Sequence, residues 1–398
     1  MDYQLFPSID KVTIKDANEV KKDIYTLWQE CFGDSDMYTD FYFDWKIGDN
    51  QVFLIYHGLE LAAMLHLNPY VLMARGSEVP ANYIVGVATK ENHRRKGLMS
   101  RLLSAAMEHM YKEKMPFTYL MPAKESIYLP FDFRIVYEQD SWNDKLIKAK
   151  AREEEIKSSK MLRAASLTDI YILPLEEDDE EKIDDLVTFS NNYLANKYDV
   201  FAKRSPYYFK RLINEMKSSL GQVLLCYDQD ELIGYISYMA EQAVYITEFV
   251  ADQEEDSILL EVWNYLASVT NRGIYRKKQG SQVPAIMTRI VNLEEFVGGL
   301  RSNTSLRLIL EVDDPIIRDN KGRFILSIDE FGGSIEKTDK EPELVIGIGD
   351  LAKLFFSSLE EEELDKLIAE SKKVNIKEIK SKLKQIHFYE SLFINDVV

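Results

Sequence analysis

Residues 84–103 contain a basic turn between two apolar segments of different periodicity. Residues 84–87 form a short, partly β-branched apolar run, which is typical of a buried strand. From Leu98 onward, apolar residues recur at helical spacing through Met110. The pattern therefore predicts a strand, a tight turn and a helix in that order.

Three consecutive cations and a glycine occupy the turn: Arg94, Arg95, Lys96 and Gly97. The first turn of a helix has unpaired N–H groups and the positive end of the helix dipole. Gly97 lacks a Cβ, so the backbone there can approach an anion closely. Cations at a helix start are mildly unfavourable unless an anion binds beside them. The alternative is a solvated helix start, but the pattern favours an anion site that can hold a pyrophosphate.

The turn resembles the acetyl-CoA pyrophosphate loop of GNAT N-acetyltransferases, Arg-x-x-Gly-x-(Gly/Ala), with Arg94, Gly97 and, in the last position, Met99. Two further segments narrow this resemblance to one type of GNAT enzyme: residues 122–128 (PAKESIY) and residues 131–133 (FDF). Together they are similar to the enhanced-intracellular-survival type of GNAT enzyme, whose type members are aminoglycoside N-acetyltransferases. That type often carries a larger residue at the position of Met99.

The resemblance implies an acetyl-CoA site in the first unit. The pantetheine arm would pair with the main chain of Val87 and Thr89 as an added strand. The turn residues would hold the phosphates: Arg94, Arg95, Lys96, Gly97, Leu98 and Met99. No metal ligand set is expected, because the Cys and His residues show no metal-ligand spacing.

Tyr128 lies in a short segment bracketed by Pro122 and Pro130. A tyrosine hydroxyl has an ordinary pKa near 10, so it is protonated at neutral pH and can act as a general acid. In the resembling family the tyrosine at this position protonates the departing CoA thiolate. From spacing alone, a buried tyrosine with an ordinary hydrogen-bond partner is an open alternative.

The chain ends in an apolar and aromatic segment, residues 386–398. In the resembling enzymes the C-terminal carboxylate enters the active site as general base, which implies this role for the carboxylate of Val398. The chain ends in Val-Val where the family usually has an aromatic residue. A tail that packs only on its own domain is the alternative.

We expect an α/β chain with mixed α+β sheets in three domains. Residues 1–150 would form an acetyl-CoA-binding GNAT domain, 151–285 a degenerate GNAT-like domain, and 286–398 a sterol-carrier-like α+β domain. In the second domain the corresponding turn, residues 251–256, reads ADQEED. Its four carboxylates would repel a pyrophosphate, so this domain should lack a CoA site.

The composition excludes several classes of protein. The 398 residues carry a formal net charge of −18, which argues against nucleic-acid binding and favours a cationic acceptor or simply solubility. No apolar run is long enough for a membrane span, and no secretory signal is visible. Two cysteines, Cys31 and Cys226, indicate a reducing, cytoplasmic location, and neither is close in sequence to the motifs above.

These observations predict an enzyme that moves an acetyl group from acetyl-CoA to a primary amine. The acceptor would be a cationic small molecule, aminoglycoside- or polyamine-like, or a lysine. The alternatives are a non-catalytic CoA-binding protein and a lipid-binding protein. A homo-oligomer is expected, since the resembling family forms hexamers. The aromatic-rich residues 37–45 would either line an acceptor pocket or pack a helix on the sheet.

Overall fold

A computed structural model describes residues 11–140, 170–252, 255–270, 272–276, 282–356, 359–370 and 376–395. These fall into two compact units. The first contains residues up to 34, 47–138 and those from 284 on, and the second contains residues 35–46 and 139–283. The Val398 carboxylate, to which the sequence assigns a catalytic role, lies outside the described residues.

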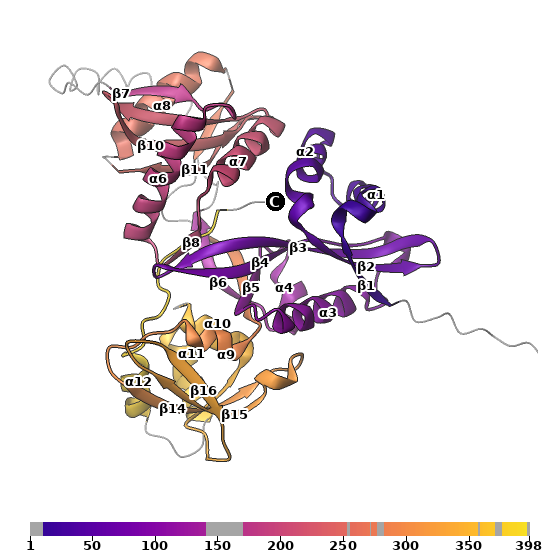
Figure 1. Ribbon diagram of the computed structural model, residues 1–398, viewed down its shortest axis with the longest axis vertical. Coiled ribbons are helices and arrows are strands. Elements are labelled where there is room, and N and C mark those ends of the chain that lie inside the picture. Colours follow the sequence, from indigo (N-terminus) through magenta and orange to yellow (C-terminus); the bar gives the residue numbers. More distant parts are fainter. Residues whose placement is uncertain are drawn as a thin grey trace, which may run out of the picture. The chain divides into compact units, whose positions relative to one another are not determined.

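The first unit has a mixed sheet in the order β1-β2-β3-β4-β5-β13-β6 (Figure 1). Its strands are β1 (Val12–Asp16), β2 (Gln51–His57), β3 (Glu60–Ala74), β4 (Ser77–Thr89), β5 (Phe117–Leu120), β6 (Arg134–Asp140) and β13 (Gln282–Ile290). Strand β13 comes from far along the chain and pairs with β5 over Met287–Ile290. The sheet is therefore completed by a strand that spans the predicted boundary between the second domain, which ends at residue 285, and the third, which begins at residue 286.

The helices of this sheet are α1 (Lys21–Cys31), α3 (Leu98–Lys112) and α4 (Glu125–Tyr128), with short 3-10 turns η1 (Ala17–Val20), η3 (Ile47–Asp49), η4 (Glu91–His93) and η5 (Leu129–Phe131). Figure 1 shows α1 and α3 on opposite sides of the sheet. Residues 52–55 of β2 are fully buried, as expected for a strand covered on both faces. Helix α3 buries one stripe that includes Leu102, Ala106 and Met110.

The remainder of the first unit is a four-stranded sheet in the order β16-β15-β14-β17 with helices packed on it. Its elements are α9 (Leu293–Gly298), β14 (Leu306–Asp313), η6 (Arg318–Asn320), β15 (Gly322–Ile328), β16 (Gly333–Lys337), β17 (Leu344–Gly347), α10 (Ile348–Phe355), α11 (Glu361–Glu370) and α12 (Ile376–Leu383). Strand β18 (Leu392–Phe393) belongs to the larger sheet instead. The sequence pattern predicts strands at residues 305–312, 323–327 and 344–348 and helices at 350–356 and 358–371, which correspond to β14, β15, β17, α10 and α11. It did not predict β16, α9 or α12. The mixed α/β fold is confirmed.

The second unit holds a five-stranded sheet in the order β12-β11-β10-β9-β7. Its elements are α2 (Asp36–Phe41), the π-helix η2 (Tyr42–Lys46), β7 (Ile170–Pro174), α6 (Glu180–Lys197), β8 (Val200–Ala202), α7 (Pro206–Ser218), β9 (Gln222–Asp228), β10 (Glu231–Met239), β11 (Val244–Ala251), α8 (Glu255–Val269) and β12 (Ile274–Arg276). Phe41, Tyr42 and Phe43 are buried, and their helices contact α7.

The order of strand, turn and helix that β4 and α3 show in the first unit recurs in the second unit in β11 and α8. Gln253 and Glu254 of its acidic turn lie outside the described residues. In the part of the chain that the structure describes, no helix is both long and apolar enough to cross a membrane.

Candidate active site

The basic turn connects the end of β4 to the start of α3. Gly97 precedes the helix with φ of 75°, and Arg95 has φ of 61°. A Cβ on Gly97 would meet no heavy atom within 4 Å, so open space borders the helix start. No side chain caps the helix at Gly97, and its first turn contains no acidic residue. The N–H groups of this turn are therefore available to an anion.

The cations of the turn differ in their partners. Lys90 lies before the turn and contacts Glu60 at 2.8 Å and Glu30 at 3.3 Å. Arg94, Arg95 and Lys96 are exposed, and no described residue forms an ion pair with them. Three adjacent cations at the positive end of a helix, with no ion pair to a described residue, make this turn attractive to an anion.

Arg94 is held against the end of β4, because its Nε donates to the carbonyl of Thr89 at 3.1 Å. It lines a hollow of about 520 Å³ with Glu30, Cys31, Lys90, Glu91 and Asn92. Cys31 Sγ lies 3.8 Å from the same Thr89 carbonyl. A cysteine is thus close to the motif in space although not in sequence, which corrects the expectation that neither cysteine lies near it.

The thiol of Cys31 is not poised for nucleophilic attack. Burial raises its pKa, and this outweighs the lowering by the hydrogen bond and charge of Arg94. A thiol with a raised pKa is largely protonated at neutral pH, and the thiolate is the nucleophile. The arrangement favours direct transfer between bound reactants over a covalent cysteine intermediate.

Strands β4 and β5 pair only over a short length. The parallel ladder joins Asn82 to Thr118 and Tyr83 to Tyr119. Strand β4 continues to Thr89, so its residues 84–89 extend beyond the pairing with β5. A strand edge that has lost its neighbouring strand, as β4 has here on the side of β5, can accept an extended ligand as an added strand. Val87 and Thr89 lie in this part and are partly exposed.

A bulge changes the direction of β4 within the part that pairs with β3 but not with β5. Met64 of β3 faces Ala88 and His66 faces Val85, so two residues of β4 oppose one residue of β3. Gly86 lies in the bulge with φ of 61°. A bulge re-aims the backbone, and here it does so next to the basic turn.

Tyr128 ends helix α4 and is 8% exposed. Its ring packs edge-on against Phe133 at 6.0 Å between centroids. Burial raises the pKa of its hydroxyl, so the group is protonated at neutral pH. Among the described residues none forms a hydrogen bond with this hydroxyl, which leaves the proton for a ligand.

The apolar tail packs on the protein as far as it is described. Tyr389 N donates to the carbonyl of Phe355 at 2.9 Å, and Arg75 donates to the carbonyl of Phe388. Tyr389 and Ile394 are 5% and 2% exposed. The tail is therefore docked through residue 394. The position of the Val398 carboxylate stays a prediction.

Residues 13–136 match the family model for the acetyltransferase (GNAT) domain. They form a GNAT acetyltransferase domain. Residues 293–369 match the model for the sterol carrier protein domain. No curated protein sequence matched the chain. The resemblance found in the sequence is confirmed for these two domains.

Solved structures share the fold over nearly the whole chain. A probable N-acyltransferase from Enterococcus faecalis V583 is 16% identical with a TM-score of 0.75, and the alignment covers 97% of this chain and 99% of that one. A GCN5-related N-acetyltransferase from Anabaena variabilis ATCC 29413 is 18% identical, with a TM-score of 0.71 and coverage of 98% and 100%. Eis1 from Mycobacterium abscessus is 12% identical, with a TM-score of 0.65 and coverage of 98% and 100%.

A GNAT domain implies acetyl-CoA as donor, and the residues present fit a CoA diphosphate. The three exposed cations supply positive charge, Gly97 leaves space for phosphate oxygens, and Arg94 borders a hollow beside β4. Leu98 is buried and Met99 half-buried, so these two could offer a ligand their main-chain N–H groups rather than their side chains.

Gly86 and His66 of the GNAT domain were not singled out from the sequence. A Cβ on Gly86 would lie 2.9 Å from both His66 Nδ1 and Trp28 Cζ3. The His66 ring stacks on Trp28 at 5.8 Å between centroids. A glycine inside a strand pattern is a known sign of a bulge, and this signal was available at Gly86.

We predict that Gly86→Ala lowers the free energy of unfolding by about 2–4 kcal/mol, from left-handed backbone strain and overpacking together. The control is Gly58→Ala, because Gly58 has φ of 63° but open space around its Cβ. The control should lose about 1–2 kcal/mol, from strain alone. Urea denaturation compares the two variants. Equal losses would show that the packing against His66 and Trp28 contributes nothing.

His66 makes stability depend on pH. Burial lowers its pKa to about 3, from an ordinary value near 6.5. Below pH 6.5 the unfolded chain takes up a proton on His66 that the folded chain does not take up. The free energy of unfolding therefore decreases as the pH is lowered. We expect a loss of about 2 kcal/mol between pH 6.5 and pH 5. Urea unfolding across this range measures it, and His66→Phe should flatten the slope. An unchanged slope would remove His66 as the cause.

Proposed function

We propose that this protein transfers an acetyl group from acetyl-CoA to a primary amine. The observation that carries the proposal is the basic turn, in which three exposed cations precede a helix that begins after a glycine, and no carboxylate in the described part of the chain pairs with them. The basic turn lies directly after the part of β4 that does not pair with β5, and an extended pantetheine arm can add to the sheet at this free edge.

Acetyl-CoA supplies the acetyl group as a thioester when it is bound. Arg94, Arg95, Lys96 and Gly97 would hold its diphosphate, together with the first N–H groups of α3. Main-chain pairing with Val87 and Thr89 would fix its orientation, which lowers the entropic barrier to attack. An N–H of this segment would also polarise the thioester carbonyl.

Two groups of the chain would handle protons. The hydroxyl of Tyr128 is protonated and buried, so it can give its proton to the departing sulfur. The attacking amine must lose a proton, and the C-terminal carboxylate of Val398 is the candidate base, directly or through a water. Holding acid and base on separate segments lets each keep the protonation state that it needs.

The acceptor we propose is cationic: an aminoglycoside- or polyamine-like small molecule, or a lysine. The formal net charge of −18 supports this, because a negative protein attracts cations over long range.

The second unit would carry no CoA, because its turn is acidic. The two cysteines are free thiols, which supports a reducing, cytoplasmic location, and a homo-oligomer stays an expectation.

The test is to incubate the full chain with acetyl-CoA and a panel containing a polyamine, an aminoglycoside and a lysine peptide. Thiol release is followed in solution, and each product is weighed by mass spectrometry. An amine that gains one acetyl group supports the proposal. CoA binding without turnover of any amine would favour a carrier, and copurified lipid without CoA binding would favour a lipid-binding protein.

A further inference from the structure

The turn that follows Tyr128 is held by contacts from outside it as well as by contacts within it. We define the Tyr128 turn as residues 128–134. It begins at the end of a four-residue helix, which is too short to be stable alone. Within it, Asp132 has φ of 60°, and its N–H donates to Leu129 O at 3.0 Å. Contacts from other elements add to these internal contacts in fixing the backbone that carries Tyr128.

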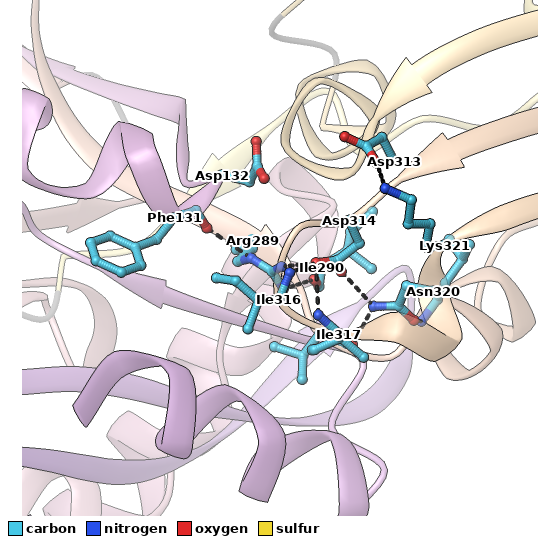
Figure 2. A network of polar contacts seen from close by, with 12 residues as sticks. Phe131, Asp132, Arg289, Ile290, Asp313, Asp314, Ile316, Ile317, Asn320 and Lys321 are labelled. Carbon is cyan, nitrogen blue, oxygen red and sulfur yellow. Dashed lines mark hydrogen bonds and ion pairs between the residues drawn. The ribbon is translucent and has the colours of Figure 1, made fainter. Parts of the chain in front are cut away.

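The first external contact is Arg289 of β13 (Figure 2). Its Nε donates to the carbonyl of Phe131 in the Tyr128 turn at 2.8 Å. Its Nη2 contacts Asp314 Oδ1 at 2.5 Å, and both side chains are fully buried. Asp314 comes from the segment after β14, beyond the first sheet. A fully buried guanidinium between a turn carbonyl and a carboxylate has little freedom to move.

Asp314 is itself fixed in place. Its Oδ1 accepts from the N–H groups of Ile316 and Ile317, both at 2.9 Å. Its Oδ2 accepts from Asn320 Nδ2 at 3.0 Å (Figure 2). Asn320 Nδ2 also donates to Val291 O, one residue beyond β13. The network therefore ties the carboxylate to the end of β13 and to the segment that follows β14.

The second external contact is Asp350 of α10. It accepts from Arg134 Nε at 2.9 Å. Arg134 also contacts Asp132 Oδ1 at 3.2 Å and donates to Phe133 O at 3.1 Å. Gly349 lies so close that a Cβ on it would be 2.5 Å from Asp132 O. The start of α10 thus touches the Tyr128 turn directly.

We propose that the sterol carrier domain positions Tyr128 through two arginine–aspartate pairs, Arg289–Asp314 and Arg134–Asp350, which we call the turn clamp. The inference rests on the proposed function, in which Tyr128 is the general acid. The clamp residues are positioning residues. They act through the Tyr128 turn and do not touch the substrate. The sterol carrier domain then serves acetyl transfer rather than lipid transport.

The physical basis is the precision that proton transfer requires. A catalytic group displaced by about 1 Å can lose about 100-fold in rate. Packing and hydrogen bonds around a catalytic side chain usually supply that precision. Here the clamp arginines donate hydrogen bonds to the carbonyls of Phe131 and Phe133, so the backbone that carries Tyr128 is held on its C-terminal side.

The test uses Asp350→Ala, because this pair is partly exposed and its loss should leave the fold intact. The buried Arg289–Asp314 pair is kept, since removing one of its charges would leave the other buried without compensation. We expect kcat to fall about 5- to 10-fold with the best amine of the panel. The affinity for CoA should stay within 2-fold, because the basic turn is on other elements. The matched control is Glu311→Gln, which removes the partner of Arg323 on the same domain.

The decisive measurement is a double-mutant cycle with Tyr128→Phe. If the clamp acts through Tyr128, Asp350→Ala should have no further effect on kcat in the Tyr128→Phe background. An equal loss in both backgrounds would overturn the inference while leaving the proposed function intact. If Tyr128→Phe retained full kcat, the general-acid assignment would be wrong, and the clamp would have no catalytic group to position.

Hydrogen–deuterium exchange tests the clamp without any acceptor. Peptides covering residues 128–134 should exchange faster in Asp350→Ala and in Gly349→Ala than in the wild type or in Glu311→Gln. Peptides of α3 should not change. Unchanged exchange in residues 128–134 would overturn the inference whatever the kinetics show.

Discussion

Replacing Tyr128 by phenylalanine should lower kcat for acetyl transfer about 100-fold, the lower end of what a general acid contributes. The affinity for acetyl-CoA should not change, because the ring and its packing on Phe133 remain. Burial raises the pKa of this hydroxyl above 10, so the wild type should keep its acid well into the alkaline range. The loss of kcat at high pH should therefore begin above pH 10 and disappear in the variant.

Tyr111→Phe is the control for this prediction. Tyr111 lies on α3, and burial also raises its pKa, but it is outside the site. Steady-state kinetics from pH 6 to pH 11 compares the two variants. If Tyr128→Phe raised KM without lowering kcat, Tyr128 would be a binding residue and another group would protonate the leaving sulfur.

Neutralising both arginines of the basic turn, Arg94→Gln with Arg95→Gln, should weaken acetyl-CoA binding about 100-fold. Each charge-assisted hydrogen bond to a phosphate contributes about 1.5–3 kcal/mol, and a factor of ten is about 1.4 kcal/mol. Neither arginine has a carboxylate partner among the described residues, so their loss breaks no internal ion pair. The fold should be unaffected.

Equilibrium dialysis with acetyl-CoA at two salt concentrations measures this effect. Salt screens exposed charges, so wild-type affinity should fall as salt rises, and the double variant should be nearly insensitive. Lys112→Gln, at the far end of α3, is the control and should behave as the wild type. A double variant that kept the full salt dependence would place the phosphate contacts elsewhere.

The basic turn, the strand before it and the helix after it could be predicted from the sequence. Both signals, the apolar periodicity and the run of cations, lie within one short stretch of the chain. The helix start at Leu98 is confirmed. The hairpin between β3 and β4 was less clear. The break that the sequence pattern shows at Gly76 is confirmed as the turn between the two strands, but the pattern did not show that β3 runs unbroken from Glu60 to Ala74. Arg75 and Gly76 then turn the chain with φ of 46° and 81°, a two-residue turn that suits a twisted hairpin.

Contacts between distant segments could not be predicted. Strand β13 enters the first sheet beside β5, more than 150 residues from it in the chain, and no local pattern specifies such a partner. Arg289 and Asp314 are charged residues with no exposure, whereas charged residues in a sequence are ordinarily expected at the surface. Cys31 likewise reaches the site only through the packing of α1. The predicted roles of Val398 and of the second unit depend on geometry of this kind.

The central claim is that one basic turn binds the diphosphate of CoA while its acidic counterpart in the second unit does not. Calorimetric titration of CoA into the full-length chain tests this most directly. The result we predict is one CoA per chain, with the affinity about 100-fold weaker in the chain carrying Arg94→Gln and Arg95→Gln. Two sites per chain, or one site of unchanged affinity in the double variant, would contradict the claim.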